Sequence, residues 1–397
     1  MMIVLIIICA LILFIAFILI DFKLGKRNHL KHLRFLDFTR TSGDYQLYTA
    51  GDPLFRDMFE DIRYAKQEIN MIFFIVKTDP ISQELMSLLK QKAEEGVKVR
   101  FMLDRIGGFR ITPKIIKDLE QSGVEFSFCA KPKFPYLFYR TQRRNHRKIT
   151  VVDGDTGYVG GFNVGKEYLG KDAELGNWRD YHLRLTGPVV HDLLTTFFDD
   201  WYLATKQTTS PKLPTNTTGD KDIEIAATDG GQLEDVFLTL IDEAEEEIFI
   251  GTPYFIPSER LFQALLRALK RGVDIKVIAP MKADHLLVKE AGIPYMDRLT
   301  RAGGEVYLFD MGFYHAKVII VDKQLCDIGT ANFDRRSLFL NKEVNTLIFN
   351  SRFVVDLRLA FLRDVQDSER FNDHADKHFN FGTKIRTGIA YFFRPLL

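Results

Sequence analysis

The chain of 397 residues contains an internal repeat, and this repeat limits the possible folds more than any other feature. The segment LMSLLKQKAEEGVKVRFML at 85–103 aligns with LFQALLRALKRGVDIKVIA at 261–279. Each copy has the pattern of an amphipathic helix, a Gly-Val turn and an apolar strand. Another apolar strand precedes each helix, at 71–76 and at 248–255. Strands and helices that alternate in two copies predict an α/β protein made of two homologous α/β/α sandwich domains.

A change in composition between the two copies predicts where one domain ends and the next begins. Residues 206–220, KQTTSPKLPTNTTGD, are rich in Thr, Pro and Lys and show no apolar period. Such a segment is typical of a linker. We therefore expect the first domain at 43–205 and the second at 221–397.

The first twenty residues contain no charged side chain. As a helix they would be about 30 Å long, which is enough to cross a bilayer. They lack the basic start and the cleavage site of a secretory signal peptide, so we expect an uncleaved anchor at 1–20. A buried core helix is the alternative. The basic segment 21–42 follows the anchor, and the positive-inside rule then predicts a single-pass cell-membrane protein with cytoplasmic domains.

Charge and cysteine content exclude several other classes of protein. The formal net charge of +1 gives no global basic field, so nucleic acid is not an expected partner. The three cysteines have neither metal-ligand spacing nor an even count: Cys9, Cys129 and Cys326. Neither a zinc site nor a disulfide framework is indicated, which fits a reducing compartment.

The strongest chemical signal is a motif that occurs twice. In each domain HxK is followed after four residues by Asp and after six more by a four-residue segment from Gly to Asn. Two matches to such a pattern in one chain are not accidental. The two sets are His146, Lys148, Asp153 and Asn163, and His315, Lys317, Asp322 and Asn332.

The spacing within the motif predicts how its residues meet. Because side chains alternate along a strand, the His and Lys of each HxK lie on one face. The apolar segments ITVV and VIIV follow as buried strands, and Asp153-Gly154 and Asp322-Lys323 are expected hairpin turns. The returning strand would bring each motif asparagine back beside its histidine, and Gly160 and Gly329 would allow close backbone approach.

These residues form the HKD signature, and the chain resembles the phospholipase D superfamily over nearly all of its soluble length. The segments RNHRKI, GGFNVG, WRDYHLRLTGP, TPYFIP, HAKVIIVD and IGTANFDRRSLFLNKEVN are similar to those of bacterial cardiolipin synthases. The resemblance implies one active site at the interface of the two halves, a phosphohistidine intermediate, and no metal or cofactor. It also implies phosphatidylglycerol and an anionic phospholipid membrane as partners.

The resemblance also implies a role for each motif residue. By analogy His146 is the nucleophile and His315 is the general acid, which later acts as the base for the acceptor hydroxyl. The sequence leaves the order of these two open. Four side chains are expected to hold the non-bridging phosphate oxygens: Lys148, Lys317, Asn163 and Asn332.

Four carboxylates complete the candidate site. Asp180 and Glu343 each open a strand downstream of a motif asparagine, and we expect them to orient the histidines. Asp153 and Asp322 belong to the catalytic signature, but the pattern favours a role in bracing the turn over one in the reaction.

Two features depart from patterns in the superfamily. The residue after the first motif glycine is Ser in many members and here is Gly161 or Thr330, which favours the cardiolipin synthase subgroup. Housekeeping bacterial synthases typically begin with two membrane helices, so the single apolar segment here suggests a shorter paralogue.

The first domain also carries about eleven extra residues ahead of its motif. The segment 131–144, KPKFPYLFYRTQRR, mixes basic and aromatic side chains, which suits an interface with anionic lipid; a solvated loop is the alternative. The tail at 384–397 has a similar composition.

Three functions are therefore weighed. The leading hypothesis is phosphatidyl transfer between two phosphatidylglycerol molecules with release of glycerol. The alternative is a phospholipase D-type phosphodiesterase that uses water or another alcohol as acceptor. A non-catalytic membrane scaffold is disfavoured because both motifs are intact. The oligomeric state is left open.

Overall fold

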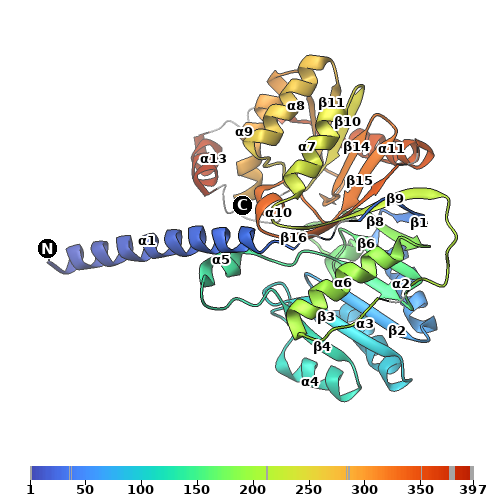
Figure 1. Ribbon diagram of the computed structural model, residues 1–397. Coiled ribbons are helices and arrows are strands. Elements are labelled where there is room, and N and C mark those ends of the chain that lie inside the picture. The colour runs from blue at the N-terminus through green and yellow to red at the C-terminus, as the bar shows by residue number, and fades with distance from the viewer. Residues whose placement is uncertain are drawn as a thin grey trace.

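The protein, seen in a computed structural model, consists of a two-part α/β body and a long helix that projects from it (Figure 1). The structure describes residues 2–34, 36, 38–211, 213–282, 284, 287–349, 351–374 and 381–393. The last four residues of the tail expected at the bilayer, 394–397, lie outside the described residues.

The first half alternates strands and helices as the repeat predicts. Its strands are β1 (Thr41–Tyr48), β2 (Glu68–Phe73), β3 (Lys98–Asp104), β4 (Glu125–Cys129), β5 (Ile149–Val152), β6 (Thr156–Gly160), β7 (Trp178–Arg179) and β8 (His182–Thr186). Its helices are α1 (Met2–Lys31), α2 (Gly51–Tyr64), α3 (Pro80–Glu94), α4 (Pro113–Gln121), α5 (Leu137–Gln142), the short η1 (Lys166–Leu169) and α6 (Val190–Thr205).

The second half repeats this order. Its strands are β9 (Lys221–Asp229), β10 (Glu247–Gly251), β11 (Asp274–Pro280), β12 (Glu305–Phe309), β13 (Phe313–Tyr314), β14 (Val318–Val321), β15 (Leu325–Gly329), β16 (Lys342–Ile348) and β17 (Ser368–Arg370). Its helices are α7 (Leu233–Glu243), α8 (Glu259–Arg271), α9 (Val288–Arg301), α10 (Arg335–Phe339), α11 (Ser351–Gln366), the short η2 (Phe371–His374) and α13 (Phe381–Phe393).

The strand order is symmetric about the junction of the two halves. On one side it runs β1-β8-β6-β5-β2-β3-β4, and on the other β9-β16-β15-β14-β10-β11-β12, with β17 added at that edge. The two central strands pair antiparallel over a short register, from Thr41–Ile223 to Gly43–Lys221. A pseudo-twofold relation therefore places equivalent strands of the two halves around one interface.

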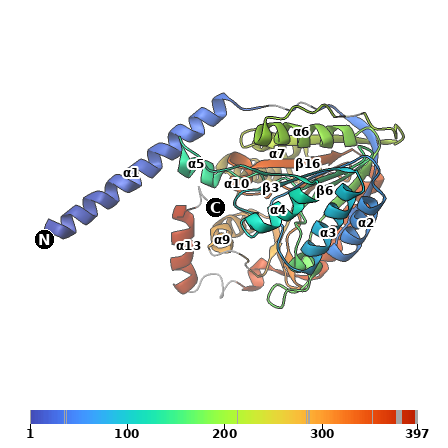
Figure 2. The same cartoon turned by 90° about the horizontal axis from the view of Figure 1, so that it is seen from below.

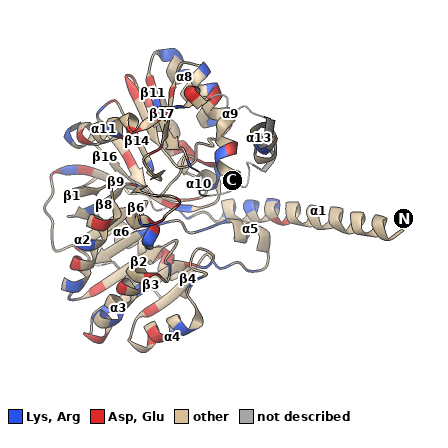
Figure 3. Cartoon of the chain, turned by 180° about the vertical axis from the view of Figure 1, so that it is seen from behind, with Lys and Arg blue, Asp and Glu red and all other residues tan. Residues whose placement is uncertain are grey.

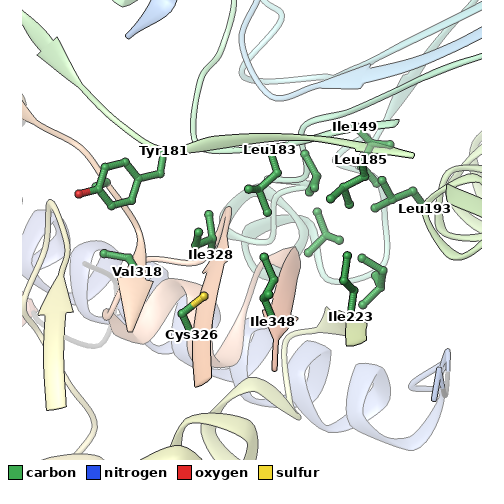
Figure 4. Close-up of a cluster of buried hydrophobic side chains, with 14 of the residues drawn as sticks. Ile149, Tyr181, Leu183, Leu185, Leu193, Ile223, Val318, Cys326, Ile328 and Ile348 are labelled. Atoms are coloured by element: carbon green, nitrogen blue, oxygen red, sulfur yellow. The ribbon is translucent and has the colours of Figure 1, made fainter. Parts of the chain in front are cut away.

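Each half-sheet is covered on both faces, which confirms the predicted sandwiches. In the first half α2, α3 and α4 cover one face and α6 covers the other (Figure 2). In the second half α7, α8 and α9 cover the outer face, and α11 packs toward the centre. The central apolar cluster joins both halves: Leu183 and Leu185 of β8 face Ile328 of β15 and Ile348 of β16 (Figure 4). Burial of this shared surface holds the halves together.

The turns within the repeat follow from local chemistry. Gly96 and Gly272 end α3 and α8 with φ of +89° and +94°, a left-handed conformation that glycine adopts without a Cβ clash. At the expected hairpins, Asp153 and Gly154 have φ of +53° and +76°. Positive φ at both central residues is the pattern of a tight hairpin turn between twisted strands.

Helix α1 extends well beyond the twenty residues expected of the anchor, because it continues to Lys31 as one element. It is long and apolar enough to cross a membrane, and no residue of its apolar window is buried. Figure 3 shows no Lys, Arg, Asp or Glu on the outer part of the helix. The body begins with β1 at Thr41, and the segment between α6 and β9 is irregular. The expected domain limits remain predictions.

Candidate active site

The two HxK segments each pair with a segment from the opposite half. At the start of β16, Lys342 forms a parallel bridge with Asn145. The backbone N–H of His146 donates to the carbonyl of Lys342 at 2.9 Å, and the N–H of Lys342 donates to the carbonyl of Arg144 at 2.9 Å. This pairing sets Glu343, the next residue of the second half, beside His146 of the first.

The equivalent pairing occurs on the other side of the pseudo-twofold. Strand β7 of the first half pairs parallel with β13 of the second, in the register Trp178–Phe313 and Tyr314–Arg179. The N–H of His315 donates to the carbonyl of Arg179 at 2.7 Å. Asp180, which follows β7, is therefore held beside His315.

The result is a crossed arrangement of histidines and carboxylates. His146 Nδ1 lies 2.9 Å from Glu343 Oε2, and His315 Nδ1 lies 2.5 Å from Asp180 Oδ2. The histidine side chains are only 11 % and 9 % exposed, and both carboxylates are fully buried. Because a carboxylate accepts the Nδ1 proton, we assign the tautomer that leaves Nε2 of each neutral ring unprotonated. Each histidine thus depends on the other half for its orientation.

The two carboxylates are supported by different groups. Glu343 accepts hydrogen bonds from Thr330 Oγ1 at 2.6 Å and Ser337 Oγ at 2.9 Å, and lies 3.3 Å from Asn341 Nδ2. Asp180 accepts from the backbone N–H of Tyr181 at 2.8 Å. The support from Ser337 is not evident in the motif, although the residue lies in the segment that resembles cardiolipin synthases.

The glycine in place of serine at position 161 has a steric explanation. A Cβ on Gly161 would lie 2.0 Å from Asp180 Oδ1, which leaves no room for any side chain. At the equivalent position the Thr330 hydroxyl donates to Glu343. The shorter aspartate therefore occupies the space that a side chain fills in the second half.

Replacing Gly161 with serine should displace the Asp180 carboxylate and lower kcat by at least about 100-fold, because small misplacements of a catalytic group cost about this much. The measurement is turnover of phosphatidylglycerol, the substrate that the sequence resemblance implies, together with the thermal midpoint. Gly388→Ser is the matched control, since a Cβ there meets nothing within 4 Å. Normal activity of Gly161→Ser would contradict the proposed fit.

The electrostatic environment keeps both histidines neutral. Burial, together with Lys148 and Lys317, lowers the pKa of His146, and burial with Lys317 lowers the pKa of His315 to about 4. Burial alone would raise the pKa of Asp180, but Lys317 and His315 lower it below its usual value. Because Lys317 of the second half acts on His146 of the first, the two motifs share one electrostatic site.

The motif lysines fold back beside their own histidines. Lys148 Nζ donates to the carbonyl of His146 at 2.7 Å, and Lys317 donates to the carbonyl of His315. Lys317 Nζ also lies 3.4 Å from Asp180 Oδ2. Burial lowers the pKa of Lys148 to about 7, so its charge responds readily to a nearby anion. The expected contact of both lysines with phosphate remains a prediction.

The motif asparagines make local hydrogen bonds. Asn163 Oδ1 accepts from the N–H of Ile75 at 3.0 Å, and its amide donates to Tyr168 Oη at 3.2 Å. Asn332 Nδ2 donates to Asp334 Oδ2 at 3.0 Å. These bonds hold the loops that follow β6 and β15, and the expected contact of both asparagines with phosphate remains a prediction.

The two motif aspartates lie at the opposite ends of β5 and β14 from the lysines, roughly 15 Å away along the strand. Asp153 accepts the backbone N–H groups of 66, 67 and 68, and Asp322 accepts those of 245, 246 and 247. This geometry supports the turn-bracing interpretation and separates both residues from the histidines.

Aromatic rings enclose the histidines, a feature that sequence analysis did not assign. Trp178 lies 4.8 Å from the ring of His315, and Phe74 meets His146 edge-on at 5.0 Å. The signal was present, since Trp178 stands two residues before Asp180 and Phe74 follows β2. These rings exclude water, which strengthens the electrostatic interactions inside the site.

In the described part of the chain, no group of three His, Cys, Asp or Glu side chains could hold a metal ion. The expectation that the reaction needs no metal remains a prediction.

The lowered pKa of His315 predicts acid sensitivity. The unfolded chain binds a proton there below about pH 6.5, whereas the folded protein binds it only near pH 4. The unfolded state therefore holds more protons between these values, and stability falls as pH is lowered from 6.5 to 4, by about 3 kcal/mol from this group. Thermal midpoints across this range should show a flatter slope for His315→Gln, whereas a slope unchanged from that of the parent protein would contradict the assignment.

Comparison with known proteins identifies the family. The family described as "Cardiolipin synthase, PLD-like domain" matches residues 58–201 and 237–365. The minor cardiolipin synthase ClsB of Bacillus subtilis is 42% identical over 366 residues, which cover 90% of each chain. The chain belongs to the PLD-like cardiolipin synthase family.

Other members and one solved structure agree with this assignment. The major cardiolipin synthase ClsA of B. subtilis is 36% identical over 88% of this chain and 74% of its own. The crystal structure of phosphatidylserine synthase from Haemophilus influenzae superposes with a TM-score of 0.73 over 94% of this chain and 100% of its own, at 14% identity. The similarity to the phosphatidylserine synthase structure supports the fold of this cardiolipin synthase family member.

Proposed function

We propose that this family member is a cardiolipin synthase, a phosphatidyltransferase that joins two phosphatidylglycerol molecules and releases glycerol. The observation that carries the proposal is the pair of crossed histidine–carboxylate contacts, His146 with Glu343 and His315 with Asp180. The 42% identity to the minor cardiolipin synthase of Bacillus subtilis supports it. Two oriented imidazoles provide a nucleophile and a proton donor in one site.

The first step forms a covalent intermediate. His146 Nε2 attacks the phosphorus of the donor lipid, the bond between phosphorus and the glycerol headgroup oxygen breaks, and the leaving oxygen takes a proton from His315 Nε2. Binding of the anionic phosphodiester favours the protonated form of His315, whose pKa is low in the empty site. Lys148 and Lys317 stabilise the charge that develops on the phosphoryl oxygens.

The second step regenerates the enzyme. A headgroup hydroxyl of another phosphatidylglycerol gives its proton to His315 and attacks the phosphorus, and the bond to His146 breaks. The products are cardiolipin and the free imidazole. Glu343 and Asp180 remain anionic throughout and stabilise each imidazole as it becomes positively charged.

The membrane arrangement supports a lipid substrate. Helix α1 could span the bilayer, and Phe138 of the insertion 131–144 packs edge-on against Phe14 and Phe17 of that helix at 6.0 and 5.9 Å. The insertion therefore lies beside the apolar part of α1, and we propose that it faces the membrane, with the catalytic halves in the cytoplasm of a single-pass protein.

The test is product analysis with the detergent-purified full chain and phosphatidylglycerol as the only lipid, in a buffer with chelator. Cardiolipin and glycerol in equal amounts are expected. Phosphatidic acid as the sole product would mean that water is the acceptor and that the chain is a phospholipase D-type hydrolase instead.

A further inference from the structure

A cavity of about 390 Å³ lies between the base of α1 and the insertion that precedes the first motif. Gly25 of α1 and His32, just past its end, form part of its wall, and Lys131, Lys133 and Arg140 line it from the insertion. Neither motif histidine lines this cavity. It is therefore a second site, distinct from the one that carries the histidines.

The wall next to His146 and Glu343 is closed by one hydrogen bond and one ion pair. Asn145 Nδ2 donates to Asp200 Oδ2 at 2.7 Å, and Lys342 Nζ pairs with Asp200 Oδ1 at 2.7 Å. All three residues are buried. The charges of Asp200 and Lys342 are satisfied within the protein, so these residues separate the cavity from the catalytic groups.

The cations at the opening are not satisfied in this way. Lys131 and Lys133 are exposed, Arg140 is half-buried, and none of the three forms an ion pair with any described residue. Arg143 pairs with Asp229, but its Nε and the Nη1 of Arg140 are buried without a hydrogen-bond partner among the described residues. A buried guanidinium N–H without an acceptor is unfavourable, and an anion in the cavity would supply one.

The insertion is held firmly against α1. The N–H of Tyr139 donates to Asp21 Oδ1 at 3.0 Å, Tyr139 Oη lies 2.5 Å from His29 Nδ1, and a Cβ on Gly25 would lie 2.6 Å from Tyr139 Cβ. These contacts fix the insertion, including α5, against the inner end of α1, where Figure 1 shows the two helices side by side.

The position along α1 indicates the source of the anion. Gly25 follows Ile20, the last residue of the uncharged segment, by five positions, which is about 8 Å along a helix. The headgroup region of each leaflet is roughly 5 to 8 Å thick. If α1 crosses the bilayer, the cavity opens at the level of the lipid phosphates.

We infer that this cavity binds the phosphate headgroup of an anionic phospholipid from the same bilayer. The lipid is bound there and not turned over, so the inference does not depend on which reaction the histidines catalyse. Unpaired lysines at the opening favour a lipid with net negative charge over a zwitterionic one, because the latter brings a cation of its own. A lipid bound in the cavity would make the position of the insertion, and of His146 two residues beyond it, depend on the lipid composition of the membrane.

The experiment measures hydrogen exchange in the full chain carrying His315→Ala, which prevents turnover, in nonionic detergent. The probes are dihexanoyl-phosphatidylglycerol, dihexanoyl-phosphatidylcholine and glycerol 1-phosphate. Peptides covering 130–143 report on the cavity, and peptides covering 178–182, which contain Asp180 and no residue of the cavity wall, report on the catalytic site. Phosphatidylglycerol should slow exchange in 130–143, phosphatidylcholine should not, and glycerol 1-phosphate should need a much higher concentration.

Charge removal then tests the site itself. The triple variant Lys131→Gln, Lys133→Gln, Arg140→Gln should raise the concentration of phosphatidylglycerol for half-protection on the order of tenfold or more. The matched control is Lys114→Gln, Lys117→Gln, Lys270→Gln, three exposed lysines on α4 and α8 that form no ion pair with a described residue, and it should leave that concentration unchanged.

Four results would overturn the inference. Protection confined to 178–182 would mean that the lipid binds only at the catalytic site, and the proposal of cardiolipin synthesis would still stand. Equal protection by phosphatidylcholine would exclude selection for anionic lipid. Equal potency of glycerol 1-phosphate would indicate a site for a soluble phosphate. Equal loss of binding in both triple variants would indicate a general charge effect.

Discussion

Replacement of either His146 or His315 with alanine should lower cardiolipin formation by at least about 10⁴-fold, because residues that act as one unit in covalent catalysis lose nearly all of their effect when either is removed. The thermal midpoint should stay close to that of the parent protein, since both side chains, although buried, lie between the halves and outside the apolar clusters. Product analysis by mass spectrometry measures the loss. His191→Ala on α6, outside the site, is the control.

An activated donor separates the two roles. With phosphatidyl-4-nitrophenol the leaving group departs as a phenolate without a proton, so the first step no longer needs a general acid. His315→Ala should then release one equivalent of nitrophenolate and accumulate a phosphatidyl group on His146, which peptide mass spectrometry would locate. Accumulation on His315 in His146→Ala would mean that the order is reversed. Substantial cardiolipin synthesis by either variant would exclude a single shared site.

The second large effect concerns the crossed carboxylates. Asp180→Asn and Glu343→Gln should each lower kcat with phosphatidylglycerol by about 10³- to 10⁴-fold, because an amide in place of the carboxylate favours the wrong tautomer of the histidine and does not stabilise its cation. Both are close in size to the native residue, so the packing around the site should be retained.

The crossing predicts which variant the activated donor restores. Asp180 serves His315, so Asp180→Asn should regain most of its first-step rate with phosphatidyl-4-nitrophenol. Glu343 serves His146, so Glu343→Gln should stay slow with either donor. Once the histidine variants have fixed the order of the two roles, the opposite pattern would mean that each carboxylate serves the histidine of its own half.

Much of the fold could be predicted because the relevant interactions are local. The helix, Gly-Val turn and strand of each repeat follow from periodicity and from the left-handed turns at Gly96 and Gly272. The hairpins at Asp153 and Asp322 follow from residue types that tolerate positive φ. The comparisons confirm the phospholipase D-like fold and the family that the motifs indicated.

Other features depend on contacts between distant segments and carry no local signal. The pairing of Trp178 with Phe313 and of Asn145 with Lys342 joins residues from opposite halves, and no periodicity reports it. The support of Glu343 by Thr330 and Ser337 comes instead from the same half, 13 and 6 residues away along the chain, and the motif spacing does not report it either. The packing of the insertion against α1 through Tyr139 likewise joins segments more than a hundred residues apart.

The repeated motif thus sets the chemistry, since the order of residues along the chain alone places His beside Lys and a hairpin after them. The motif does not determine which carboxylate forms a hydrogen bond with each histidine. That choice belongs to the folded protein, because the two halves meet through the short register of β1 with β9 and through their central apolar cluster. This contact brings Asp180 to His315 and Glu343 to His146, and neither half can assemble a complete histidine site alone.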